Sequence, residues 1–243
     1  MINFKSEQIY IVTGASSGIG EATALLLNEL GATVVAIARN EKRLLDMKAR
    51  CKNSENMHIE VKDLTQDIEG LPKYVKELKN KYGKFKGLAY CAGIAGVTPI
   101  QSVEYDHIKK LFDINYFAPV FMVKGFVDRR NNIGQGASIV IVSSISGLKS
   151  DKGHSEYAGS KAAIAASMKS IAREVTNQGI RINCVSPSDV KTPLTMHKIE
   201  QENPKYPFGC GEVSDVANMI TFLLSGKAKW ITTQNYVVDC GYM

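Results

Sequence analysis

Tyr157 and Lys161 stand four residues apart in the stretch "HSEYAGSKAAI" (154–164), where most of their neighbours are alanine, serine or glycine. In a helix, side chains at positions i and i+4 lie on the same face. A phenol has an ordinary pKa of about 10, too high for efficient proton exchange near neutrality. A neighbouring ammonium group stabilises tyrosinate and lowers that pKa. The pair therefore predicts a tuned proton donor, with small neighbours that leave space for a flat ring.

A glycine-rich stretch, "TGASSGIG" (13–20), separates an apolar run from a helix-like run. Its glycines allow a tight turn, and free N–H groups at the start of the following helix attract a pyrophosphate. The spacing is G-x-x-x-G-x-G instead of the usual G-x-G-x-x-G, and a purely structural turn would look similar. The strand before it and the helix after it favour a dinucleotide site.

Arg39 follows directly on the second apolar run, with Lys42 and Arg43 close by. An acidic residue at this distance from the glycines would bind the 2′-hydroxyl of a ribose. A guanidinium group instead pairs with a 2′-phosphate. Arg39 therefore predicts NADP(H) over NAD(H), although an ordinary surface charge is the alternative interpretation.

Composition excludes several classes of protein. Five scattered cysteines without a C-x-x-C pair predict reduced thiols in the cytoplasm, with no disulfide framework and no zinc site. The four histidines have no ligand spacing, so no metal is expected. No stretch approaches the roughly 20 apolar residues of a membrane-spanning helix. The net charge of +6 comes without a nucleic-acid-binding motif, so neither a membrane nor a nucleic acid is an expected partner.

Short apolar runs alternate with longer amphipathic runs along all 243 residues. This alternation predicts one α/β domain over 1–243 with a doubly wound, mostly parallel, seven-stranded sheet and helices on both faces. Strands are expected at 8–12, 33–37, 58–62, 87–91, 138–142, 181–185 and 236–239. Helices are expected at 18–30, 41–51, 67–82, 104–131 with a break near Pro119, 157–177 and 213–224. The proline-rich segment 187–211 is expected to form a substrate flap over the carboxyl ends of the strands.

Ser144 ends the fifth apolar run, thirteen residues before Tyr157. With T-G-x-x-x-G-I-G and Y-x-x-x-K, this spacing resembles the short-chain dehydrogenase/reductase family over essentially the whole chain. The resemblance implies a Rossmann fold and four catalytic residues. Tyr157 would protonate a carbonyl being reduced, and Lys161 would lower its pKa and bind the nicotinamide ribose. Ser144 would hold the substrate oxygen, with Ser143 as the alternative. Asn115 would anchor a water of the proton relay, or it could be a helix-kinking residue satisfied by backbone.

The same resemblance implies a set of cofactor contacts. Asp63 would lie beside the adenine, Val190 near the carboxamide and Thr192 near the pyrophosphate. The full set is Gly14, Ser16, Ser17, Ile19, Arg39, Asp63, Leu64, Cys91, Ala92, Gly93, Tyr157, Lys161, Val190 and Thr192. The chain departs from the family at Tyr90 and Cys91, where two asparagines are usual, and at Ser188, Thr233 and Cys240, where glycine is usual.

The overall length and the ending "YVVDCGYM" are most similar to 3-oxoacyl-acyl-carrier-protein reductases and other small ketoreductases. The expected function is NADP(H)-dependent reduction of a ketone to a secondary alcohol, with a 3-oxoacyl thioester on an acidic carrier protein as a candidate substrate. Arg129, Arg130 and Arg173 fall near the positions where such reductases contact the carrier. Sugars, polyols or other small carbonyl compounds are the alternative substrates, with His154 as a further candidate contact. A dinucleotide-binding regulator without turnover is the alternative class. The resemblance also implies a homotetramer or homodimer.

Overall fold

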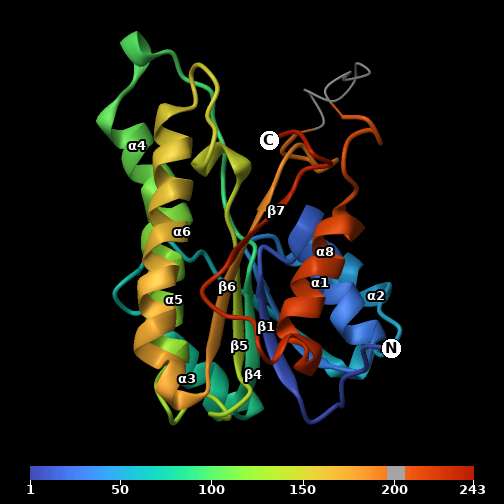
Figure 1. Ribbon diagram of the computed structural model, residues 1–243. Helices are drawn as coiled ribbons and strands as arrows, with labels where there is room; N and C mark the ends of the chain where they lie inside the picture. Colours follow the sequence, from blue (N-terminus) through green and yellow to red (C-terminus); the bar gives the residue numbers. More distant parts are fainter. Residues whose placement is uncertain (196–205) are drawn as a thin grey trace.

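A computed structural model describes residues 1–195 and 206–243 of the chain as one α/β domain (Figure 1). Its sheet has the strand order β3-β2-β1-β4-β5-β6-β7, and every neighbouring pair is parallel. The predicted seven-stranded parallel sheet is thereby confirmed. The strands are β1 (Ile9–Thr13), β2 (Thr33–Ala38), β3 (Met57–Val61), β4 (Phe85–Tyr90), β5 (Ser138–Val142), β6 (Arg181–Pro187) and β7 (Asn235–Val238).

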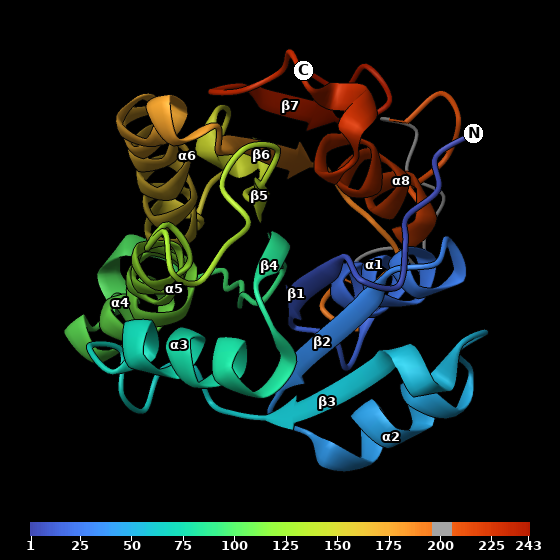
Figure 2. The same ribbon diagram turned by 90° about the horizontal axis from the view of Figure 1, so that it is seen from below.

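Helices cover both faces of the sheet (Figure 2). All six residues of β2 and all five of β5 are buried, as the continuously apolar runs predicted. One face packs against α3 (Leu71–Tyr82), α5 (Ala118–Phe126) and α6 (Ser155–Val175), and α4 (Tyr105–Phe112) lies on the same side beside α6. The other packs against α1 (Gly18–Glu29), α2 (Glu41–Ala49) and α8 (Val213–Leu224). No helix in the described part of the chain is long and apolar enough to span a membrane.

The helix expected over 104–131 differs most from its prediction. It ends at Phe126, and a π-helical segment, Asp113–Phe117, joins α4 to α5 just before Pro119. Proline lacks an N–H group, so a regular α-helix cannot continue its hydrogen bonding through this position. The expected break is therefore present as a change of helix type, and the chain still runs in one direction.

The helix expected over 67–82 begins later, at Leu71. Asp67 Oδ1 accepts a hydrogen bond from the backbone N–H of Gly70 at 3.0 Å, so the preceding residues form a turn. Of the flap expected over 187–211, residues 196–205 lie outside the described part of the chain. Residues 190 and 211 form an isolated parallel bridge, which brings the two ends of this segment together.

Candidate active site

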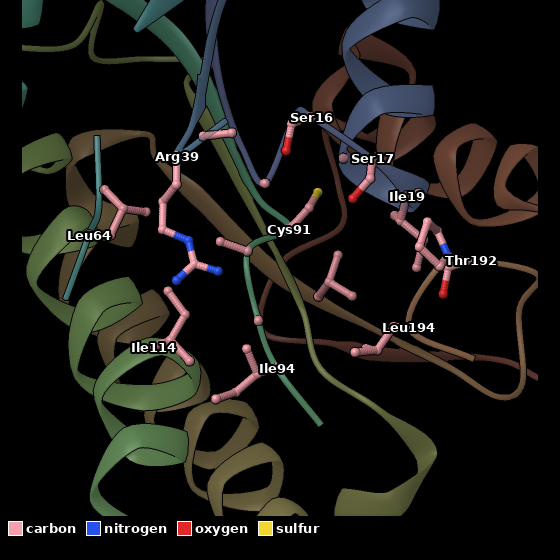
Figure 3. A pocket seen from close by; sticks show the side chains of 18 of the residues that line it. Ser16, Ser17, Ile19, Arg39, Leu64, Cys91, Ile94, Ile114, Thr192 and Leu194 are labelled. Carbon is pink, nitrogen blue, oxygen red and sulfur yellow. The ribbon is translucent and has the colours of Figure 1, made fainter. Parts of the chain in front are cut away.

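A cavity of about 880 Å³ runs along the carboxyl ends of β1, β2, β4, β5 and β6 (Figure 3). Strand order reverses between β1 and β4, and in open α/β sheets ligands bind at this point. The cavity contains all the predicted cofactor residues and three of the four predicted catalytic ones. Among its lining residues are Gly14, Ser16, Ser17, Ile19, Arg39, Asp63, Leu64, Cys91, Ala92, Gly93, Ser144, Tyr157, Lys161, Val190 and Thr192.

The glycine-rich turn brings three backbone segments into close contact. Gly14 has a φ of +67°, and a Cβ atom on it would lie 2.8 Å from the backbone N of Ala92. A Cβ atom on Gly20 would lie 2.4 Å from the carbonyl oxygen of Gly14. Only glycine fits these positions, so the chain passes closely under the first turn of α1. This turn lines the cavity, where its free N–H groups can bind a pyrophosphate.

Thr13 fixes the loop after β4 against the end of β1. Its Oγ1 accepts hydrogen bonds from the backbone N–H groups of Cys91 at 3.1 Å and Ala92 at 3.2 Å. The Cys91 side chain is labelled among the cavity wall residues in Figure 3. Burial raises the pKa of the Cys91 thiol to about 12, although a Thr23 hydrogen bond and the Lys161 charge lower it. The Cys91 thiol is therefore neutral where it lines the cavity.

The opposite end of the cavity, at the ends of β2 and β3, is strongly polar. Arg39 lies over the cavity in Figure 3, 73% exposed, with Nη1 3.7 Å from Asp63 Oδ2. Asp63 Oδ1 accepts hydrogen bonds from the Thr65 N–H at 2.9 Å and the Thr65 hydroxyl at 2.7 Å. Burial favours the neutral acid, but these bonds and the Arg39 charge hold the pKa of Asp63 below its ordinary value. Arg43 and Lys62 also line this end, which is therefore rich in positive charge.

Ser144 and Ser143 have different surroundings after β5. Ser143 Oγ is buried and donates a hydrogen bond to the carbonyl oxygen of Lys161 at 2.9 Å. Ser144 Oγ accepts from the Ser146 N–H at 3.1 Å, and its hydrogen bond with Tyr157 lowers the pKa of that phenol. The structure thus brings Ser144 to Tyr157 and directs Ser143 to the backbone of α6.

Lys161 does not tune Tyr157 in the way that the i, i+4 spacing predicted. Its Nζ donates to the Val142 carbonyl at 3.0 Å and lies 5.9 Å from the centre of the Tyr157 ring. Burial lowers the pKa of Lys161 to about 8. The pKa of Tyr157 is raised, because burial and the Asp189 carboxylate outweigh the Ser144 hydrogen bond. The prediction that Lys161 lowers the pKa of Tyr157 is therefore wrong for this structure.

Asn115 lies in the π segment, one layer behind the cavity wall. Its Oδ1 accepts from the Ile94 N–H at 3.1 Å, and its Nδ2 donates to the Ile94 carbonyl at 3.0 Å. Nδ2 also donates to Ser160 Oγ at 3.1 Å, and Ser160 Oγ donates to the Tyr157 carbonyl at 2.8 Å. A Cβ atom on Gly93 would lie 2.9 Å from Asn115 Oδ1 and 3.3 Å from Lys161 Nζ. Asn115 thus connects the loop after β4 to the first turns of α6.

The described ends of the flap close one side of the cavity. Thr192 packs over the glycine-rich turn, since a Cβ atom on Gly18 would lie 3.2 Å from its methyl group. Ser188 replaces the family's glycine, and its Oγ lies 2.6 Å from the Tyr206 hydroxyl. That hydroxyl also donates to Asp189 Oδ2 at 3.0 Å. The return segment of the flap is thereby joined to the loop after β6.

Several site residues were not predicted from the sequence. Ile94, Ile114 and Leu194 add apolar walls, and the position of Ile94 directly after the Ala92–Gly93 pair was an available signal. Asp189 acts on the pKa of Tyr157 from the loop after β6, and Ser160, three residues further along α6, connects Tyr157 to Asn115 of the π segment. The sequence carries no local pattern for either contact between elements.

The candidate arginines for a carrier protein lie far from the cavity. Asn131 accepts a hydrogen bond from the N–H of Phe85, the first residue of β4, so Arg129 and Arg130 sit at the amino ends of the strands. Arg173 lies in the last turn of α6, which leads to the amino end of β6. Arg130 also pairs with Asp128 at 2.6 Å. His154, in contrast, has its ring centre 6.5 Å from that of Tyr157.

A cavity at the switch point of a doubly wound parallel sheet is the arrangement of a nucleotide-binding α/β protein. A family model described as "Enoyl-(Acyl carrier protein) reductase" matches residues 14–243. A 3-oxoacyl-[acyl-carrier-protein] reductase of Rickettsia felis is 32% identical over 96% of this chain and 95% of its own length. An L-xylulose reductase of Caenorhabditis elegans is 31% identical over 96% of this chain and 94% of its own.

A solved structure of similar fold comes from the same class of proteins. A short-chain type dehydrogenase/reductase from Mycobacterium ulcerans superimposes with a TM-score of 0.90 at 28% identity, covering 99% of this chain and 91% of that one. The chain therefore belongs to the short-chain dehydrogenase/reductase family of oxidoreductases, as its motifs indicated.

Proposed function

We propose that the protein reduces a ketone to a secondary alcohol, using NADP(H) and the Tyr157 hydroxyl as proton donor. The observation that carries the proposal is the layout of one cavity, which is lined by the glycine-rich turn and Arg39 and also by Ser144, Tyr157 and Lys161. When bound, the dinucleotide supplies a hydride to the carbonyl carbon. The carbonyl oxygen then takes the phenolic proton of Tyr157, and the alcohol leaves.

The chain's own residues fit such a dinucleotide. The turn from Gly14 to Ile19 would hold the pyrophosphate, together with Thr192, which packs against it. Asp63 and Leu64 would border the adenine. The residues that would surround the nicotinamide ring are Cys91, Ala92, Gly93, Tyr157, Lys161 and Val190, all of which line the cavity.

NADP(H) is favoured over NAD(H) by the charges at the adenine end. Arg39, Arg43 and Lys62 all line the cavity there. The nearby Asp63 carboxylate is held by Thr65 and faces the Arg39 guanidinium at 3.7 Å, so its charge is partly compensated. Arg39→Ala should weaken NADPH binding by about tenfold or more and leave NADH binding within about twofold, since it removes a charged hydrogen bond to the phosphate.

The protonation state of Tyr157 favours reduction. Burial and the Asp189 carboxylate raise the pKa of this phenol, so it carries its proton at neutral pH. A protonated phenol is the acid that carbonyl reduction needs, and the Ser144 and Tyr157 donors would stabilise the alkoxide as it forms. Lys161, with a pKa lowered to about 8, is a group that can exchange protons near neutrality.

A 3-oxoacyl thioester is the leading substrate class, because the Rickettsia felis relative is a reductase of 3-oxoacyl-carrier protein. A small free carbonyl compound, such as a keto-sugar, is the second candidate. Two observations favour it: the L-xylulose reductase relative, and the position of Arg129, Arg130 and Arg173 at the end of the subunit away from the cavity. An acidic carrier bound to these arginines would not reach the cavity of the same subunit.

The test follows NADPH and NADH absorbance against 3-oxoacyl thioesters, diketones and keto-sugars. Wild type should consume NADPH with one of these classes. Tyr157→Phe and Ser144→Ala should lose at least about a hundredfold in kcat. Ser143→Ala should lose far less, because the Ser143 hydroxyl donates to the backbone carbonyl of Lys161. NADPH binding without turnover on any class would instead favour a dinucleotide-binding regulator.

We further propose a cytoplasmic homotetramer or homodimer built on the helical segments that contain Asn115 and Tyr157, from α4 to α6, and on the last strand, β7. All five cysteines are free thiols, which suits a reducing compartment. Tyr105 and Phe117 are 77% and 42% exposed on this helical face, which suits burial against a second copy. Light scattering on the purified protein would measure the mass, and a monomer would refute this part.

A further inference from the structure

A hydrogen bond joins the end of β4 to the π segment that carries Asn115. Tyr90 Oη donates to the carbonyl oxygen of Ile114 at 2.9 Å, and the Tyr90 side chain is 1% exposed. Tyr90 occupies a position where the family usually has asparagine, so the phenol is a feature of this chain.

The Ile114 carbonyl lacks the donors that a helix would give it. In an α-helix its partner would be the N–H of Ala118, but that group bonds to the Asp113 carbonyl. In a π-helix its partner would be residue 119, and Pro119 has no N–H. The Tyr90 hydroxyl therefore provides the Ile114 carbonyl with a hydrogen-bond donor that neither helix type can provide here.

Asn115 follows Ile114 directly, and its orientation depends on this segment. Its side chain binds both backbone groups of Ile94 and reaches Ser160, which bonds to the Tyr157 carbonyl. We infer that Tyr90 is a positioning residue, whose hydroxyl fixes the π segment so that Asn115 holds the cavity wall and the first turns of α6 in register. The catalytic part of this inference rests on the proposed function.

Tyr10 provides a matched control on the neighbouring strand. It is fully buried in β1, next to β4, and its hydroxyl has no hydrogen-bond partner among the described residues. Tyr10→Phe and Tyr90→Phe therefore remove the same atom from the same sheet. Only Tyr90→Phe removes a bond to the π segment.

Amide hydrogen exchange tests the structural half without any substrate. In Tyr90→Phe, residues 113–118 should exchange at least about fivefold faster than in wild type, since one buried hydrogen bond is lost. The strands β1 and β5 should be unchanged, and Tyr10→Phe should exchange as wild type does in the π segment. No change at 113–118, or an equal rise throughout the sheet, would overturn the inference.

A double-mutant cycle with Asn115→Ala tests the catalytic half. Tyr90→Phe should lower kcat about tenfold with KM within twofold, and Tyr10→Phe should leave both unchanged. Because Tyr90 acts through Asn115, the double variant should be no slower than Asn115→Ala alone. Additive losses would overturn the positioning role. A wild type that turns over no carbonyl would refute the proposed function, while the exchange measurement would still decide the structural contact.

Discussion

Replacing Lys161 by methionine should make the protein more stable at neutral pH while abolishing turnover. Lys161 is 5% exposed, and the described hydrogen bond of its ammonium group is to the Val142 carbonyl. A buried charge with so little compensation destabilises the folded state. Methionine fills a similar volume without a charge, so Lys161→Met removes that penalty.

The pKa of Lys161 gives the expected size of this gain in stability. It falls from 10.5 to about 8 on folding, which at 1.36 kcal/mol per unit amounts to roughly 3 kcal/mol of destabilisation below pH 8. Leaving the Val142 carbonyl without its donor costs about 1 kcal/mol. The variant should therefore be roughly 2 kcal/mol more stable than wild type at pH 7.

The pH dependence identifies the cause. Between pH 8 and pH 10.5 the unfolded chain still binds a proton at Lys161 that the folded protein has released, so wild-type stability rises with pH in this window. The stability of wild type relative to Lys161→Met should increase by about 2 kcal/mol from pH 7 to pH 9.5. Other titrating groups are common to both proteins and cancel in the difference.

The measurement is urea unfolding followed by circular dichroism at several pH values, with both proteins at one concentration. NADPH oxidation is recorded on the same samples. A stability difference that stays constant from pH 7 to pH 9.5 would refute the reasoning, because it would mean that Lys161 has the same pKa folded and unfolded.

Two further substitutions test the turn and the phenol. Gly20→Ala places a methyl 2.4 Å from the Gly14 carbonyl, so it should abolish NADPH binding in calorimetry and lower the melting temperature; Gly226→Ala, where a Cβ meets open space, is the control. Wild-type affinity in Gly20→Ala would contradict the close approach. Asp189→Asn removes a charge that raises the pKa of Tyr157, so Tyr157 should lose its proton at a lower pH than in wild type. The decline of reduction activity at alkaline pH should therefore begin at a lower pH in this variant. If the alkaline decline in the pH–rate profile were unchanged or moved to higher pH, this electrostatic effect of Asp189 would be excluded.

The sheet and the catalytic residues could be predicted because both leave local patterns in the sequence. Continuous apolar runs identified the strands, and the distance from Ser144 to Tyr157 identified the family. The protonation of the site was not predictable in the same way. An i, i+4 pair indicates that two side chains share a helix face, but the Val142 carbonyl and the Asp189 carboxylate come from other strands and loops. Burial, which dominates both pKa shifts, is a property of the whole fold.

The departures at Tyr90 and Cys91 illustrate how one turn can be kept with different side chains. Thr13 accepts from the N–H groups of Cys91 and Ala92, so the loop after β4 is fixed through its backbone and does not depend on a side-chain amide at position 91. Tyr90 satisfies the Ile114 carbonyl, which Pro119 leaves without a helix donor. Each replacement is thus matched by a contact from another element. In the proposed function, the charged and polar side chains that would bind the nicotinamide ribose are Tyr157 and Lys161, which line the same cavity as the neutral Cys91.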